Sequence, residues 1–138
     1  FINKKVLVVE GEAGSGKSHL LGYVAENNMS EDRCNTVLLL GQQFVLKEEP
    51  SKQIMMLLDK DMTFDDFLSI CETKGNYDGT ITVIMIDAIN ECYKNDIWKT
   101  YLNNIITKVE NCEYVRLICS IRSTYKKQVF NNELVNSL

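Results

Sequence analysis

A short glycine-rich segment near the start of the chain limits its possible folds more than any other feature. The residues from Gly11 to Ser18 read Gly-Glu-Ala-Gly-Ser-Gly-Lys-Ser, which matches the pattern G-x-x-x-x-G-K-S. This pattern is informative where a buried strand precedes it and a helix follows it. The continuous apolar run from Val6 to Val9 is typical of a strand buried on both faces, and helical spacing follows at Leu20, Leu21, Val24 and Ala25.

The residue types in this loop suit a polyphosphate. Glycines let backbone N–H groups turn inward and approach phosphate oxygens, and the following helix adds the positive end of its dipole. Lys17 would neutralise the β- and γ-phosphates of ATP, and the Ser18 hydroxyl would be a ligand of Mg²⁺. A glycine-rich turn that binds nothing is the alternative. The predicted nucleotide-binding residues are Gly11, Glu12, Ala13, Gly14, Ser15, Gly16, Lys17, Ser18 and His19, although a structural or surface role is favoured for the His19 ring.

The rest of the chain alternates between strand and helix patterns. Apolar runs from Thr36 to Leu40, from Ile81 to Ile86 and from Val115 to Ile121 predict three further strands. Strands that alternate with helices are the signature of an α/β fold with a mostly parallel sheet. We therefore predict a single α/β domain over residues 1–138. Because Phe1 to Asn3 do not resemble a natural translation start, the chain is expected to be an excised piece of a larger protein.

Helices are predicted between these strands. The polar stretch from Lys47 to Lys52 contains the only proline and reads as a loop, and two short amphipathic helices are expected after it, the second capped by Thr63. Gly75 and Gly79 are expected to bracket a turn. The tail from Thr124 to Leu138 is expected to be helical and truncated. A longer helix is predicted before the fourth strand, with one apolar stripe made of Ile97, Trp98, Tyr101, Leu102, Ile105, Ile106 and Val109. The two aromatic residues of this stripe are expected to lie in the core.

Two acidic residues follow the third predicted strand. Asp87 comes directly after Ile86, and an aspartate at the carboxyl end of such a strand lies at the ligand edge of the sheet. There it could hold a magnesium-bound water, which is the Walker B role. Glu91, four residues later, could orient or deprotonate the water that attacks the γ-phosphate. The alternatives are a helix cap for Asp87 and an exposed loop acid for Glu91.

An arginine ends the fourth predicted strand. If this strand lies between the first and the third, its carboxyl end points at the γ-phosphate, where Arg122 could sense that group or stabilise transition-state charge. An arginine that only solvates the end of a strand is the alternative. The predicted catalytic residues are thus Lys17, Glu91 and Arg122, and the predicted magnesium ligands are Ser18 and Asp87.

Composition narrows the function classes. A formal net charge of -4 and a pI near 5.0 argue against a nucleic-acid footprint over the whole domain. Lys126-Lys127 is the only compact basic candidate near the end of the chain, and an ordinary solvated face is the favoured interpretation of that pair. No apolar run reaches the roughly 18 residues that a membrane span needs. The five cysteines are odd in number and include no C-x-x-C pair, which favours reduced thiols in a cytoplasmic protein over a disulfide framework or a zinc site.

Three segments together resemble a known family. Gly-Glu-Ala-Gly-Ser-Gly-Lys-Ser, Ile-Asp-Ala-Ile-Asn-Glu and Ser-Ile-Arg-Ser-Thr-Tyr are similar to motifs of the STAND-class P-loop NTPases, close to the NACHT group. With Leu-Leu-Leu-Gly-Gln-Gln-Phe after the second strand, the likeness extends to prokaryotic antiviral STAND ATPases. It spans the chain from Val6 to about Tyr125. The P-loop is shared with very many families, and the later two motifs are more specific.

The resemblance implies a three-layer P-loop NTPase fold of the ASCE type, with sheet order 5-1-4-3-2 and the fifth strand truncated here. It implies a switch domain of a larger signalling protein, in which ATP binding accompanies self-association. It gives Lys17 and Ser18 the P-loop roles, Asp87 the Walker B role, and Glu91 the acidic position of the extended Walker B. Arg122 would be the sensor arginine of the fourth strand.

Two departures from the family bear on activity. NACHT-type Walker B segments often carry a second acid where this chain has Asn90. Family members also complete the nucleotide pocket with helical and winged-helix domains, which this chain lacks. We therefore expect the isolated domain to fold but to hydrolyse ATP slowly, well below the typical enzyme median of about 10 per second.

The sequence also allows three other functions. A nucleotide or small-molecule kinase would need an acceptor pocket and usually an arginine-rich lid, and the chain has three arginines, Arg33, Arg116 and Arg122. A nucleic-acid-associated AAA-like ATPase would normally carry basic loops, which the acidic balance does not favour. A module in which the nucleotide is purely structural is the third alternative. ATP is preferred over GTP on the family likeness, since no N/T-K-x-D segment appears.

Overall fold

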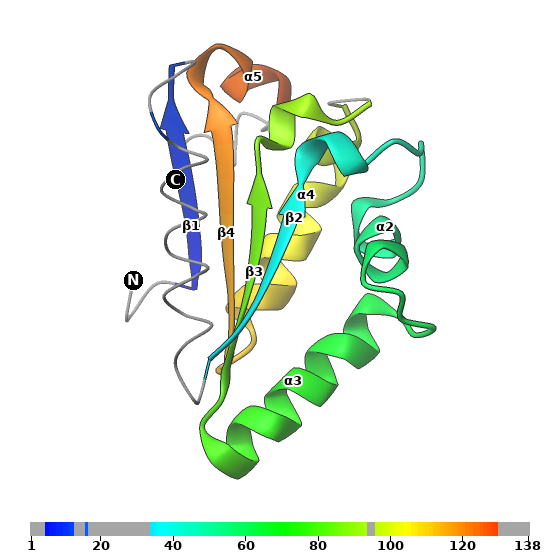
Figure 1. Cartoon of the computed structure of the whole chain (residues 1–138), viewed down its shortest axis with the longest axis vertical. Coiled ribbons are helices and arrows are strands. Elements are labelled where there is room, and N and C mark those ends of the chain that lie inside the picture. Colours follow the sequence, from blue (N-terminus) through cyan, green and yellow to red (C-terminus); the bar gives the residue numbers. More distant parts are fainter. Residues whose placement is uncertain (1–4, 13–15, 17–33, 94–95, 130–138) are drawn as a thin grey trace.

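The computed structural model describes residues 5–12, 16, 34–93 and 96–129. Four strands in this part of the chain form one parallel sheet in the order β1-β4-β3-β2 (Figure 1). The predicted α/β class is confirmed, as is the 1-4-3-2 part of the sheet order. The fifth strand stays a prediction. The strands are β1 (Val6–Gly11), β2 (Cys34–Leu40), β3 (Ile81–Asp87) and β4 (Val115–Arg122).

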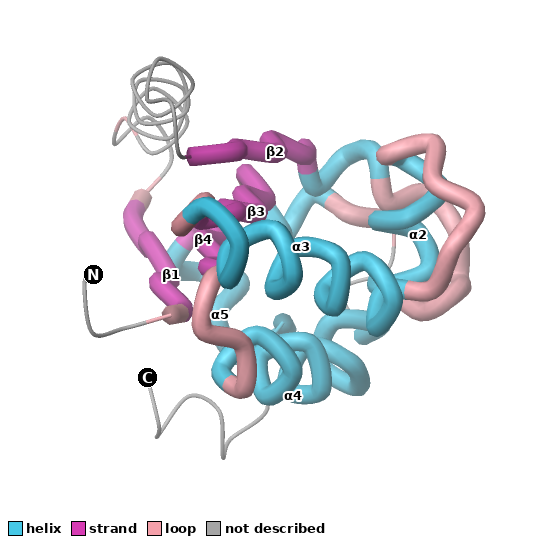
Figure 2. Tube along the Cα trace, turned by 90° about the horizontal axis from the view of Figure 1, so that it is seen from below, coloured by secondary structure: helices cyan, strands magenta, loops and turns pink. Residues whose placement is uncertain are grey.

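Two long helices cover one face of this sheet. Figure 2 shows α3 and α4 side by side on that face, and their apolar side chains share a core with Ile84, Ile86 and Leu117 of the central strands. The helix expected around Leu20 to Ala25 lies outside the described residues. The third layer of the predicted fold, to which that helix would belong, therefore stays a prediction. The described helices are α2 (Pro50–Leu57), α3 (Phe64–Asp78), α4 (Asp96–Glu110) and α5 (Lys126–Val129).

The two central strands are buried on both faces, as the continuous apolar runs predict. In β3, Ile84 faces the helices, whereas Val83 and Met85 pack with Ile118 on the opposite face. The run in β1 was also predicted to be buried on both faces, and the apolar run in β2 has the same pattern, but Leu7 and Leu38 are 40% and 42% exposed. The reason is position, because β1 and β2 are the edges of the described sheet.

Trp98 lies at the centre of the core, as predicted. Its side chain is fully buried on α4, and its ring meets the buried ring of Phe44 edge-on at a centroid distance of 4.9 Å. This contact joins α4 to the segment after β2 and matches the geometry that aromatic pairs prefer. Tyr101, on the same stripe, is half-buried.

Pro50 begins a helix, whereas the sequence placed it in a loop that extends to Lys52. It is the first residue of α2, where its missing N–H has no partner to lose and its fixed φ suits the helix. Gln53 secures the preceding loop, because its side-chain amide donates to the carbonyls of Leu46 and Glu48. The polar run therefore reads as a loop only up to Glu49.

Gly75 was predicted to start a turn and instead lies inside α3. A Cβ at Gly75 would lie 2.1 Å from Cγ of Tyr114, so the glycine makes room for that ring. The helix ends at Gly79, whose φ of 79° is the left-handed conformation that glycine favours at a helix end. The predicted cap at the other end is confirmed, since Thr63 Oγ1 accepts a hydrogen bond from Asp66 N at 3.1 Å.

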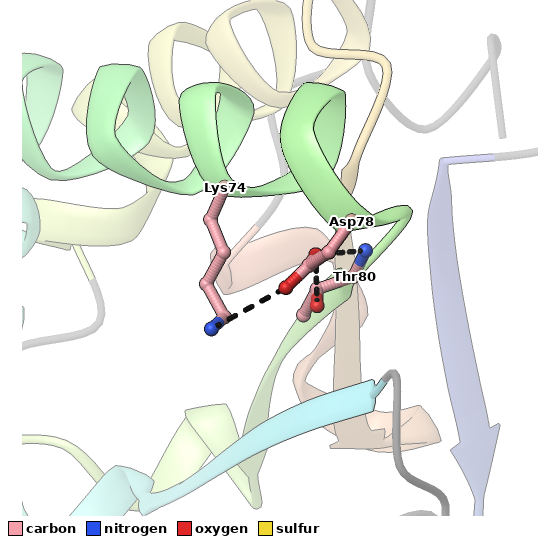
Figure 3. Close-up of polar contacts among 3 residues, drawn as sticks. All are labelled: Lys74, Asp78 and Thr80. Carbon is pink, nitrogen blue, oxygen red and sulfur yellow. Dashed lines mark hydrogen bonds and ion pairs between the residues drawn. The ribbon is translucent and has the colours of Figure 1, made fainter.

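The connection from α3 to β3 is fixed by one carboxylate (Figure 3). Asp78 Oδ1 accepts hydrogen bonds from the hydroxyl and the backbone N–H of Thr80, and Asp78 Oδ2 lies 3.7 Å from Lys74 Nζ. These hydrogen bonds, that from the Thr80 hydroxyl above all, hold the pKa of Asp78 below its usual 3.8. The turn sets where β3 begins and therefore determines the position of Asp87 at the end of that strand.

Candidate functional site

Those predicted site residues that the structure describes lie at one edge of the sheet. Because all four strands are parallel, their carboxyl ends meet at the same edge, at the top of Figure 1. Gly11, the last residue of β1, is in register with Arg122, the last residue of β4. Asp87, at the end of β3, is in register with Leu40 at the end of β2. Segments more than 70 residues apart in the chain thus contribute to one edge.

Part of the phosphate-loop pattern lies within the described residues. Gly11 ends β1, and the exposed Glu12 follows it directly. Gly16 has a φ of 91°, a region that only glycine enters without strain, so the second glycine of the pattern is required by backbone geometry. The other predictions for this loop lie outside the described residues: Ala13, Gly14, Ser15, Lys17, Ser18 and His19.

Asp87 is held by a serine of the neighbouring strand. Only 9% of Asp87 is exposed, and its Oδ1 accepts a hydrogen bond of 2.6 Å from Ser120 Oγ. Ser120 Oγ in turn accepts a hydrogen bond of 2.7 Å from the backbone N–H of Ala88. No described residue donates to the second oxygen, Oδ2. The carboxylate is thus fixed on one oxygen and left with acceptor capacity on the other.

A tight turn carries the chain away from Asp87. Ala88 has φ 55° and ψ 57°, the left-handed region that a residue with a Cβ rarely adopts, and a 3₁₀ turn follows over Ile89–Glu91. The N–H of Glu91 donates to the Ala88 carbonyl at 2.9 Å. This turn leaves the Glu91 side chain exposed at the carboxyl edge, four residues after the buried Asp87.

The same turn is tied to the end of β4. Asn90 Oδ1 accepts a hydrogen bond of 3.0 Å from the backbone N–H of Arg122. Arg122 itself is exposed at the edge. Asn90 therefore links the segment of Glu91 to the strand end that presents Arg122.

An ion pair lies beside this edge. Lys126 Nζ, on α5, lies 3.2 Å from Glu10 Oε2, next to Gly11. The pair is half-exposed, and such surface pairs contribute about 0–1 kcal/mol. It places opposite charges together, so the Lys126 charge is locally balanced.

The chemistry of the edge suits a magnesium polyphosphate. Mg²⁺ prefers oxygen ligands and is usually held by one or two carboxylates together with phosphate oxygens, and Asp87 offers such an oxygen. Arg122, which is paired in register with Gly11 of the neighbouring strand, suits a phosphate. Cys119, next to Ser120, is fully buried, and burial raises the pKa of its thiol to about 12, so it stays neutral.

Sequence reasoning included Ser120 only as the first residue of the segment Ser-Ile-Arg-Ser-Thr-Tyr and gave it no role. The available signal was a single hydroxyl among the apolar residues of a central strand. The role of Gly41 was also missed. A Cβ there would lie 1.9 Å from the Ala88 carbonyl oxygen, so the end of β2 packs directly against the turn after Asp87.

No protein-family model matches the sequence, and no curated protein matches it at a significant level. Cdc6p from Pyrobaculum aerophilum is similar in structure, with a TM-score of 0.61 and 14% identity over 95% of this chain and 36% of that one. This likeness shows that the chain shares the α/β fold of that protein.

Two further structures match more distantly. PCH-2 from C. elegans has a TM-score of 0.48 and 14% identity, covering 91% of this chain and 32% of that one. Domain III of the Thermotoga maritima replication initiation protein DnaA has a TM-score of 0.49 and 21% identity, covering 95% of this chain and 50% of that one. The chain thus spans 32% to 50% of the length of these three chains. Within the described residues, no helix combines the length and the apolar character that crossing a bilayer requires.

Proposed function

We propose that this chain is an ATP-binding switch domain of a STAND- or NACHT-like protein and that it hydrolyses ATP slowly. The observation that carries the proposal is the convergence of three segments at the carboxyl edge of the sheet. Gly11, which opens the loop, pairs in register with Arg122, and Ser120 of the same strand hydrogen-bonds Asp87. A P-loop ATPase needs its phosphate loop, acidic strand end and sensor side chain at this edge.

The residues divide the work of hydrolysis. A water attacks the γ-phosphorus, the bond to the bridging oxygen breaks, and ADP leaves with that oxygen. The loop amides and Lys17 bind the phosphates, while Glu91 orients the water and accepts its proton. Arg122 balances charge on the γ-phosphate. Bound Mg²⁺, for which Ser18 and Asp87 are the proposed ligands, supplies neutralisation of the phosphate charge.

Slow turnover follows from the acidic positions. The turn after Asp87 supplies one exposed acid, Glu91, because the position before it is an asparagine, Asn90, whose side-chain oxygen accepts a hydrogen bond from the backbone N–H of Arg122. With one base and no neighbouring carboxylate in that turn, proton transfer from water depends on Glu91 alone. Self-association through the larger protein belongs to the same proposal and rests on the family likeness. A cytoplasmic location also belongs to it and rests on the cysteine pattern, which favours reduced thiols.

Calorimetry tests the proposal. The chain is titrated with ATP and with GTP in the presence of Mg²⁺, beside two variants that each remove one positive charge. Lys17→Ala should abolish measurable binding of ATP, because the β- and γ-phosphates lose their cation. Lys47→Ala is the matched control, since Lys47 is exposed in the loop before α2, and it should bind as the wild type does. A folded wild type that binds neither nucleotide, or Lys17→Ala with unchanged affinity, would refute the proposal.

A further inference from the structure

Ser120 places a hydroxyl in the apolar core, where packing alone does not explain it. It is fully buried in β4, and its neighbours Cys119 and Ile121 pack in the main hydrophobic core. Burying a hydroxyl is unfavourable unless it is hydrogen-bonded. The two hydrogen bonds that Ser120 makes with described residues go to the end of β3, 32 and 33 residues away in the chain. The side chain therefore serves that strand end.

The direction of these two hydrogen bonds follows from the donors present. The backbone N–H of Ala88 can only donate, so it occupies an acceptor position of Ser120 Oγ. The single hydroxyl hydrogen is then directed at Asp87 Oδ1, 2.6 Å away. A hydrogen bond to a carboxylate is shorter and stronger than one between neutral groups. Ser120 thus holds one particular oxygen of Asp87.

The same serine also holds the backbone that follows Asp87. Ala88 adopts a left-handed conformation that a residue with a Cβ rarely takes, and its N–H is bound by Ser120. Gly41 closes the other side of this turn, since no side chain would fit between its Cα and the Ala88 carbonyl. The carboxylate and its supporting peptide are therefore fixed by one hydroxyl.

We propose that Ser120 is a positioning residue for the magnesium end of the nucleotide site. It orients Asp87 so that Oδ1 is occupied and Oδ2 faces the ligand, and it does not itself touch metal or nucleotide. The inference rests on the proposed nucleotide-binding function. Carboxylates that bind metals are commonly hydrogen-bonded in this way, and loss of such a partner typically costs about 10–100-fold in metal affinity.

The test separates magnesium from nucleotide. Affinity for ATP is measured by calorimetry with Mg²⁺ and again with EDTA, for the wild type, Ser120→Ala and Ser120→Thr. Ser120→Ala should lose about 10–100-fold in affinity for ATP with Mg²⁺ and should stay within about twofold of the wild type in EDTA. Ser120→Thr keeps the hydroxyl and should recover most of the magnesium-dependent gain. A merely structural loss would lower both affinities together.

Cys119→Ala is the matched control, because it shortens the next buried side chain of the same strand without touching Asp87. It should keep the full magnesium dependence. If Ser120→Ala does not fold, Ser120→Cys decides, since it preserves the volume and leaves only a weak donor. A wild type without affinity for ATP overturns the proposed function and this inference together. A wild type that binds, with Ser120 variants of unchanged magnesium dependence, overturns the inference alone.

Discussion

Gly41 and Ala88 touch through their backbones at the carboxyl edge of the sheet. A Cβ built on Gly41 would lie 1.9 Å from the Ala88 carbonyl oxygen and 2.7 Å from its carbon. Leu40 and Asp87, the residues just before them, are paired in register. The end of β2 therefore braces the turn that presents Asp87, and the segment Gly-Gln-Gln-Phe that contributed to the family likeness acquires a physical reason for its glycine.

Gly41→Ala should damage both stability and nucleotide binding. The new methyl meets rigid backbone, so we expect a loss of about 1–3 kcal/mol in the free energy of unfolding and weaker binding of ATP with Mg²⁺. Gly75→Ala is the matched control, because its methyl would clash with the Tyr114 ring at the opposite edge. Urea unfolding followed by Trp98 fluorescence measures stability, and calorimetry measures affinity. Equal affinities for the two folded variants would contradict the bracing role.

Glu91→Gln should separate binding from hydrolysis. The amide keeps the size of the side chain but cannot accept the proton from water, so ATP hydrolysis should fall by about 10²–10⁴-fold while affinity for ATP stays within about twofold. Glu113→Gln, an exposed change at the opposite edge of the sheet, should alter neither. Phosphate release under saturating ATP measures the rate. Unchanged hydrolysis in Glu91→Gln would leave Glu91 without its proposed task.

The strands and the edge where ligands would bind could be predicted from local sequence. Continuous apolar runs identify β3 and β4, because a strand covered on both faces has no polar side to show. Asp87 was found because it follows such a run directly. The segment order then fixes the α/β class. These signals are short-range, and each lies within about ten residues.

The contacts that refine the site depend on distant residues and were not predictable in this way. The bond from Ser120 to Asp87 spans 33 residues and exists only because β3 and β4 are neighbours in the sheet. Gly75 looks like a turn residue until the Tyr114 ring, 39 positions later, is placed against it. Local pattern cannot show which of two roles a glycine or a serine has when the partner lies on another element.

Thiol labelling should report the packing of the core. Four of the five cysteines are buried, and Cys34 is half-buried. At pH 8 a disulfide reagent should react quickly with at most one thiol of the native chain, and Cys34→Ser should remove that fast phase. Cys119 should react last, since burial raises the pKa of its thiol to about 12 and the thiolate is the reactive form. Rapid labelling of several thiols without denaturant would contradict this packing.

The acid dependence of stability should reveal the Asp78 turn. Because the pKa of Asp78 is held below its usual 3.8, first by the Thr80 hydroxyl, its ionised form stabilises the fold above pH 3.8. This contribution is lost as pH falls through the lowered folded-state pKa. Asp78→Asn should therefore be less stable than the wild type near neutral pH, and the gap should close on acidification. Lys74→Gln should keep most of the pH dependence, because Lys74 is a lesser cause of the shift than Thr80. Urea unfolding of the three proteins at a series of pH values, followed by Trp98 fluorescence, measures the difference in free energy of unfolding between wild type and variant. A difference that stays constant with pH would show that Asp78 stabilises the turn without its charge.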